Sequence, residues 1–243
     1  MPRLSLPKTL LALPLVVLLA ACSDADEALP YVERPVEEIY LEAQAAFEGD
    51  DLKKAAQLYD EVERQHPYSQ WARRAQLMSA YSHYQDLRYD DAIITLDRYL
   101  DLHPASEGAA YALYLKGLCY YEQISDVGRD QQMSQLAAAT LNQVIRRFPD
   151  TPYARDARLK FDLTQDHLAG KDMEIGRWYQ GQQHYNAALR RFQSVVDNYE
   201  TTSHAPEALM RLTEVYLALG LPDQAKRQTA VLGYNYPGSR WYE

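Results

Sequence analysis

The chain has 243 residues, 47% of them hydrophobic, and a formal net charge of −9, so it is long enough for a sizeable core and too acidic for nucleic acid. It opens with Arg3 and Lys8, an apolar run over residues 10–19, and the sequence Leu-Ala-Ala-Cys ending at Cys22. This order is typical of an export signal, and the run is too short to span a membrane as a helix. We therefore predict a signal peptide over residues 1–21.

The small residues before Cys22 resemble the lipobox of bacterial lipoproteins, which implies a diacylglyceryl thioether and an acylated amine, such as palmitate, on Cys22. Several acyl chains anchor firmly, because each buried methylene contributes about 0.8 kcal/mol. Ser23 follows where Asp would resemble an inner-membrane retention signal. The expected location is the outer membrane, facing the periplasm, with residues 22–35 as a flexible lipidated tether. Losing Arg3 and Lys8 takes the charge from −9 to −11, so lipid rather than headgroup attraction must anchor the chain.

Only two cysteines occur, and lipid consumes Cys22, so no intrachain disulfide is expected. Cys119 lies within the apolar helical stretch 113–121, where a buried, inert thiol is the expected outcome.

A repeated spacing organises the rest of the chain. Five segments, at 66–69, 103–106, 148–151, 199–202 and 236–239, combine an aromatic residue or His, usually Pro, and then Ser or Thr, a pattern that ends one helix and starts the next. Before each junction, four residues recur at successive spacings of four, three and five. The spacings of four and three place the first three side chains on one helical face. They are Ala55, Tyr59, Val62, Pro67; Ala92, Leu96, Tyr99, Pro104; Ala137, Leu141, Val144, Pro149; Ala188, Phe192, Val195, Glu200; and Ala225, Thr229, Leu232, Pro237.

An earlier small residue in each copy predicts a first helix that packs closely against the second. These residues are Ala43, Ala80, Gly117, Gly176 and Thr213. The pattern resembles the tetratricopeptide repeat, although the alanine intervals of 37, 45, 51 and 37 residues exceed the usual 34. The extra residues predict a loop over 124–134 and a lengthened helix over 152–170.

The expected fold is therefore all-α, a solenoid of about five tetratricopeptide-like helix pairs. We assign pairs one and two to residues 36–104 as a substrate groove, pair three with its loop to 105–151, and pairs four and five to 152–243 as a partner-docking region. Stacked pairs bury their apolar faces against one another, and first helices line the inner surface.

If that geometry holds, the inner surface is aromatic in the first three pairs and more polar in the last two. The expected groove residues are Tyr40, Gln44, Phe47, Leu77, Tyr81, Tyr84, Tyr114 and Tyr121. The expected docking residues are Met173, Arg177, Gln180, Leu209, Glu214 and Leu217. Tyrosines suit an extended peptide because they join wide apolar faces to a polar tip; the alternative for each is packing between repeats.

No catalytic or metal-binding motif accompanies these features, so we expect neither enzyme activity nor a metal, and no cofactor beyond the lipid on Cys22. The sequence has no HExxH, GxSxG, phosphate-binding GK[ST] or paired CxxC pattern, and its six histidines are scattered. The pairs Asp50-Asp51 and Asp90-Asp91 stand at expected helix starts, which explains them without calcium.

The lipobox, the repeats and the run 173–179, Met-Glu-Ile-Gly-Arg-Trp-Tyr, together resemble the lipoprotein family of the β-barrel assembly machine. The resemblance implies that the N-terminal pairs receive the C-terminal signal strand of unfolded outer-membrane β-barrel proteins. It also implies that the C-terminal pairs dock on a POTRA domain of BamA, with BamC and BamE alongside where the organism has them. The alternatives are a pilotin-type lipoprotein for secretin assembly and a cell-wall enzyme or its activator.

Overall fold

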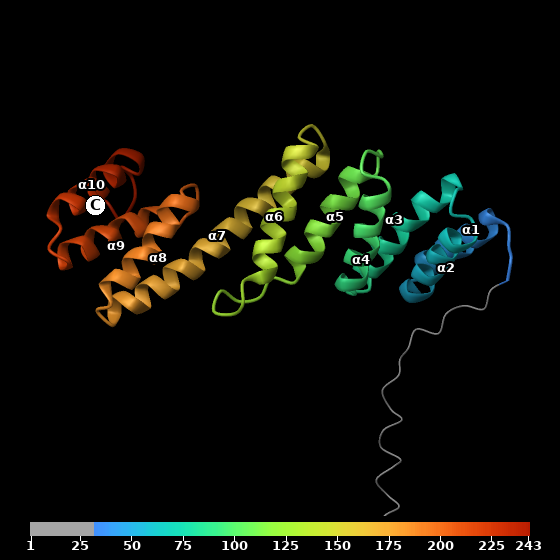
Figure 1. Cartoon of the computed structure of the whole chain (residues 1–243), viewed down its shortest axis with the longest axis horizontal. Helices are drawn as coiled ribbons and strands as arrows, with labels where there is room; N and C mark the ends of the chain where they lie inside the picture. Colours follow the sequence, from blue (N-terminus) through green and yellow to red (C-terminus); the bar gives the residue numbers. More distant parts are fainter. Residues whose placement is uncertain (1–31) are drawn as a thin grey trace, which may run out of the picture. The chain divides into compact units, whose positions relative to one another are not determined.

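The computed structural model describes residues 32–243. Within it, residues 34–243 form one compact unit that contains ten α-helices. No strand occurs in that described range. Figure 1 shows the helices in chain order. They are α1 (Val36–Glu48), α2 (Leu52–Gln65), α3 (Gln70–Gln85), α4 (Tyr89–Leu102), α5 (Ala109–Glu122), α6 (Gln132–Arg147), α7 (Pro152–Gly181), α8 (Tyr185–Asn198), α9 (Ala205–Ala218) and α10 (Pro222–Asn235). The prediction of an all-α fold of about five helix pairs is confirmed.

The predicted signal peptide, Cys22 and most of the predicted tether lie outside the described residues. Among the helices that are described, none combines the length and the apolar character needed to cross a membrane.

The repeated register is the core of the fold. Every alanine that opens the register on a second helix is buried, from Ala55 to Ala225, and so are its partners four and seven positions further on, except Thr229. Each helix contacts the next along the chain, and the first helices of the first four pairs also touch in succession, α1 with α3, α3 with α5 and α5 with α7. These contacts build one continuous face from first helices.

The junctions cap helices at two of the five predicted places. Ser69 and Thr151 accept hydrogen bonds from the amides of Ala72 and Ala154, at 3.1 and 3.2 Å, in the N-cap geometry. Ser106 and Thr202 instead donate to carbonyls of the preceding turn, those of His103 and Tyr199. The capping prediction is wrong there because two more residues separate each hydroxyl from the helix start.

In four of the five helix pairs, the turn between the two helices contains one residue with left-handed backbone conformation. Asp50, Leu87, Gln183 and Gly220 have φ between 60° and 74°, and only the last is a glycine. Asp51, next in the first turn, caps α2 by accepting the Lys54 amide, as its position in the sequence predicts.

The residues by which the chain exceeds the usual repeat length lie in α7 and in the segment before α6. Helix α7 has 30 residues and contributes Ala154 and Ala157 to one buried cluster and Ala169 and Met173 to another. Residues 123–131 form a loop, which ends earlier than the predicted 124–134 because α6 begins at Gln132. Lys171 holds this loop by donating to the Gly128 carbonyl at 2.9 Å. The long helix therefore joins the cores of pairs three and four.

Candidate functional site

A row of aromatic rings follows the first helices of pairs one to four. Ring centroids lie 5.6 Å apart between Phe47 of α1 and Tyr81 of α3, and 6.3 Å apart between Tyr81 and Tyr84. On α5 and α7, Tyr111 and Tyr114 each lie 5.5 Å from Tyr153. We call these six residues the aromatic row: Phe47, Tyr81, Tyr84, Tyr111, Tyr114 and Tyr153.

The row has two halves, one on α1 and α3 and the other on α5 and α7, and helical spacing explains how each is arranged. Tyr81 and Tyr84 on α3, like Tyr111 and Tyr114 on α5, are three residues apart and share one helical face. Tyr111 packs against the same buried cluster as Tyr81 and Tyr84, which links the halves across α3 and α5. The rings are half-buried rather than enclosed, so their remaining faces are open to a ligand.

Three tyrosines of the row have a raised pKa and keep their protons at neutral pH. Burial raises the pKa of Tyr84 to about 12, and it raises the pKa of Tyr111 further. Burial also raises the pKa of Tyr114, whose hydroxyl donates to Asp156 at 2.5 Å. A neutral phenol keeps one donor and one acceptor, so the row can offer hydrogen bonds to a peptide backbone as well as apolar surface.

The expected groove residues divide between this surface and the core. Tyr40 is only 7% exposed, and its ring packs against Tyr59 and Trp71 at 5.4 and 4.7 Å. Its predicted inward-facing orientation is therefore corrected: Tyr40 belongs to the core between α1, α2 and α3. Gln44 is exposed and donates to Glu48 at 2.9 Å.

The other expected groove residues are half-buried and lie on first helices. Phe47, Tyr81, Tyr84 and Tyr114 belong to the row, as described above. Tyr121 lies outside the row, near the C-terminal end of α5, and the Lys160 amine lies 5.9 Å from its ring centre.

Beside the row lies a hollow of about 830 Å³ between the starts of α3 and α5. Its lining combines four apolar or aromatic side chains with two arginines and one acid. We call it the α3–α5 hollow, and it is lined by Gln70, Trp71, Arg73, Arg74, Leu77, Tyr99 and the segment Ala105 to Gly108. Leu77, an expected groove residue, lies one helical turn before Tyr81, so the hollow and the row are neighbours along α3.

The expected docking residues also divide. Met173 and Leu209 are 0% and 2% exposed, so the expectation that their side chains face a partner is corrected. Met173 packs with Phe192 and Leu212 in the core of pairs four and five. Leu217 is exposed and lines a separate hollow with Tyr234 and Tyr242.

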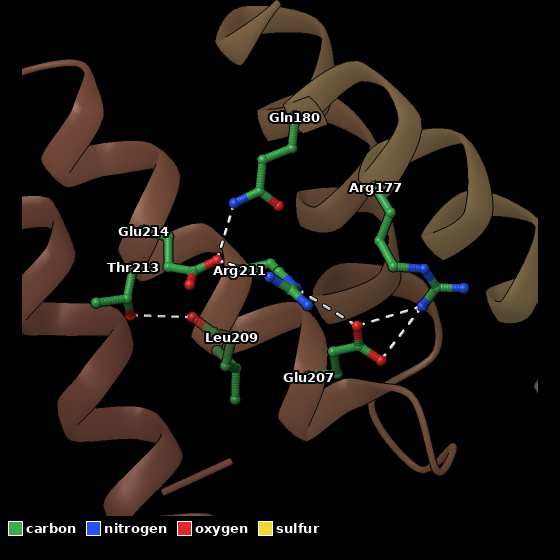
Figure 2. A network of polar contacts seen from close by, with 7 residues as sticks. All are labelled: Arg177, Gln180, Glu207, Leu209, Arg211, Thr213 and Glu214. Carbon is green, nitrogen blue, oxygen red and sulfur yellow. Dashed lines mark hydrogen bonds and ion pairs between the residues drawn. The ribbon is translucent and has the colours of Figure 1, made fainter. Parts of the chain in front are cut away.

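The polar members of that set come together in an ion-pair network, shown in Figure 2. Arg177 of α7 reaches Glu207 of α9 at 3.2 Å, and Gln180 donates to Glu214 at 2.8 Å. Arg211 contacts both acids, at 3.4 and 3.0 Å. The Arg211 guanidinium also lies 5.6 Å from the Trp241 ring centre.

Sequence reasoning missed Glu207 and Arg211 in this network and Tyr111 and Tyr153 in the row. The tyrosines carried a usable signal, because Tyr111 and Tyr114 repeat the spacing of Tyr81 and Tyr84. Glu207 carried none, since it lies 30 residues from Arg177 and only the stacking of α9 on α7 brings them together.

Cys119 is buried in the cluster between pairs two and three, and burial raises the pKa of its thiol to about 12. Across residues 32–243, no group of three or more His, Cys, Asp and Glu side chains is placed to hold a metal ion.

Comparison with known proteins returns one family over most of the chain. The YfiO family, described as outer membrane lipoprotein, matches residues 32–232. The outer membrane protein assembly factor BamD of Caulobacter vibrioides is 51% identical over 214 residues, which is 88% of this chain and 70% of that protein. BamD of Rickettsia prowazekii is 44% identical over 240 residues, 98% of this chain and 95% of that protein. Among solved structures, the TPR domain of P58(IPK) covers 85% of this chain and 53% of its own, with 15% identity and a TM-score of 0.46.

Proposed function

Because this chain belongs to the YfiO family of outer membrane lipoproteins, whose relatives are the BamD assembly factors, we propose that it binds unfolded outer-membrane proteins and docks on the barrel-forming subunit of the assembly complex. In this proposal it is anchored by lipid on Cys22, faces the periplasm and acts as a scaffold without catalysing a reaction. The aromatic row receives the C-terminal strand of the substrate, and the α7–α9 network meets a POTRA domain of BamA.

The observation that carries the proposal is the continuity of the aromatic row. Six half-buried rings from four successive first helices form two contacting groups, and both groups pack against one buried cluster between α3 and α5. All six rings are partly exposed, and contiguous apolar patches on a surface mark interaction sites. A strand with alternating aromatic side chains would cover the rings, while its backbone carbonyls accept from row hydroxyls other than that of Tyr114, which donates to Asp156.

The same contacts explain how a scaffold could act without an energy source. An unfolded strand has an unpaired edge that promotes aggregation, and the row would shield it until the strand pairs with a barrel seam. Release then depends on competition, since backbone pairing in the barrel replaces weaker contacts with rings. A modest affinity is therefore expected.

Peptide binding tests the groove. A peptide of about ten residues with alternating aromatic side chains is titrated against the full-length protein in detergent, comparing wild type with Tyr81→Ala and Tyr84→Ala. Each change is expected to weaken binding about five- to tenfold, the loss typical of a buried aromatic contact. The control is Tyr68→Ala, which removes a fully exposed ring outside the row. Helicity should stay unchanged in all three, and unaltered affinity in both row variants would refute the groove assignment.

A further inference from the structure

Four exposed arginines gather at the junction between α6 and α7. Arg146 and Arg147 are the last two residues of α6. Arg155 and Arg158 lie in the first two turns of α7. Within residues 32–243, none of the four has a carboxylate at ion-pair distance, although the Arg147 guanidinium lies 5.3 Å from the ring centre of Phe148. We call these four residues the arginine patch.

The positive charge is local, because the chain as a whole is acidic. Residues 146–158 contain four arginines and two aspartates, a formal charge of +2, whereas the whole chain carries −9. One of those aspartates, Asp156, already pairs with Lys160 at 2.8 Å, so it does not neutralise an arginine of the patch. The patch is therefore a cationic surface on a protein that anionic surfaces otherwise repel.

Helix stability accounts for only part of the patch. Cations at the end of a helix stabilise it through the helix dipole, which explains Arg146 and Arg147. At the start of a helix the same charge is unfavourable, and the first turn of α7 has no acid to compensate Arg155. A negatively charged ligand would offset that unfavourable interaction.

An apolar side chain shares one face of α7 with two of these arginines. Leu159 is 65% exposed and lies four residues after Arg155, while Arg158 lies three residues after Arg155. Residues three and four apart on a helix occupy the same face. Basic and apolar side chains together are typical of helices at a membrane surface, where guanidinium groups meet headgroup phosphates and the apolar chain enters the acyl boundary.

The patch lies on the edge of the solenoid at which the chain from Cys22 enters. The Arg34 amide, just before α1, donates to Gln65 Oε1 at 2.9 Å, and the Arg34 carbonyl lies 2.7 Å from His66 Nε2. The start of α1 thus lies against the end of α2. First helices pack in succession, and Figure 1 shows the loops before α3, α5 and α7 along one edge. The start of α7, with its arginines, belongs to that edge.

We infer that the arginine patch binds the phosphate headgroups of anionic phospholipids in the membrane that holds the lipid anchor. The inference goes beyond the proposed function and takes from it only the lipid on Cys22. Because the anchor keeps the protein at the membrane, headgroup contact need not attach it; the contact selects one orientation, with the start of α7 against the surface. Tyr153, in the aromatic row, lies two residues before Arg155, so this orientation brings one end of the row to the membrane.

Fluorescence quenching in vesicles tests the inference. Gln143→Cys places a thiol at an exposed position one turn before the end of α6. This thiol can be labelled alone, because Cys119 is buried and Cys22 carries the proposed lipid. The labelled, lipidated protein is incorporated into phosphatidylcholine vesicles, with or without phosphatidylglycerol, that contain a lipid with a nitroxide headgroup. Quenching should be strong only with phosphatidylglycerol and should fall in high salt, which screens the charges.

Substitutions in the patch should abolish that difference between the vesicles. Each arginine near an anionic surface contributes about fivefold to the ratio of bound to unbound orientations, so Arg155→Gln with Arg158→Gln should lower the ratio about 25-fold. The matched control is Arg190→Gln with Lys226→Gln, two exposed cations on α8 and α10 without an ion pair in the described range. This control should leave the quenching unchanged.

A second label reports the orientation. Gln182→Cys lies at the other end of α7, whose 30 residues span about 45 Å, and a fluorophore there should stay unquenched. Equal quenching of the two labels would overturn the inference, because the protein would then have no preferred orientation.

The remaining outcomes separate this inference from the proposed function. Equal quenching with and without phosphatidylglycerol, or quenching that survives the patch substitutions, would overturn headgroup binding and favour an acidic protein as the partner of the patch. Loss of quenching in the Arg190 and Lys226 control would also overturn it, by showing an effect of overall charge. Uptake of the thiol reagent by wild type would instead refute the lipid on Cys22.

Discussion

Gly176 of α7 lies directly against Phe192 of α8: a methyl group added to the glycine would stand 2.5 Å from the ring carbon Cε1. The same relationship recurs in pair three, where a methyl group on Gly117 would stand 2.9 Å from Leu141 Cδ2. Phe192 and Leu141 occupy one register position, four residues after the buried alanine of each second helix. The small residue on the first helix is thus the complement of a large residue on the second.

Gly176→Ala is therefore expected to destabilise the fold, although alanine favours helix more than glycine does. The ring of Phe192 is fully buried and cannot swing away, so overpacking should cost about 1–3 kcal/mol. Gly181→Ala, at the end of the same helix, has open space around the new methyl group and should be neutral or stabilising by up to about 1 kcal/mol. Urea unfolding followed by circular dichroism compares the two. A Gly176→Ala protein as stable as Gly181→Ala would contradict the close packing.

The sequence could predict this register because its information is local. Offsets of four and three place Ala188, Phe192 and Val195 on one face whatever surrounds the helix, and all three are buried. The rotation of first helices is different, because it depends on two neighbours at once. Counting from the repeat predicts Tyr40 and Met173 on the inner surface, yet both turn into the core. For Met173 the cause is α7, whose 30 residues pass from one core to the next.

Acid should weaken the contact between α5 and α7 on which the row depends. Lys160, and after it Tyr114, hydrogen-bond to Asp156 and lower the pKa of its carboxyl. A carboxyl whose pKa is lower in the folded state stabilises the fold above its unfolded value, about 3.9, and loses that contribution as pH falls through the folded value. The melting temperature of wild type should thus exceed that of Asp156→Asn at pH 7, and the gap should close below about pH 4.

The control for this pH series is Asp162→Asn, an exposed position on α7 with no hydrogen bond or ion pair among the described residues. It removes the same charge and should change the melting temperature little at pH 7. A gap for Asp156→Asn that stayed constant from pH 7 to pH 3 would show that the substitution acts through packing and not through the carboxylate.

The α7–α9 network gives the docking proposal its own test. Arg177 and Glu207 pair at 3.2 Å with the arginine side chain 42% exposed, so the pair contributes only about 0–1 kcal/mol to stability and leaves the guanidinium available to a partner. Arg177→Glu should leave the fold intact and reduce recovery of the POTRA-containing barrel protein when the tagged lipoprotein is purified from detergent-solubilised membranes. Arg190→Glu makes the same charge change at an exposed position on α8 and should not reduce recovery.

Exchanging the two charges separates an internal role from a docking role. Arg177→Glu combined with Glu207→Arg restores an ion pair between α7 and α9 and keeps the net charge, but it presents the opposite pattern to a partner. If Arg177 contacts the partner, recovery stays low in this double variant; if it only braces α9, recovery returns to the wild-type level. Recovery of a secretin in place of the barrel protein, from wild type, would favour a pilotin role and remove the basis for assigning this network to a POTRA domain.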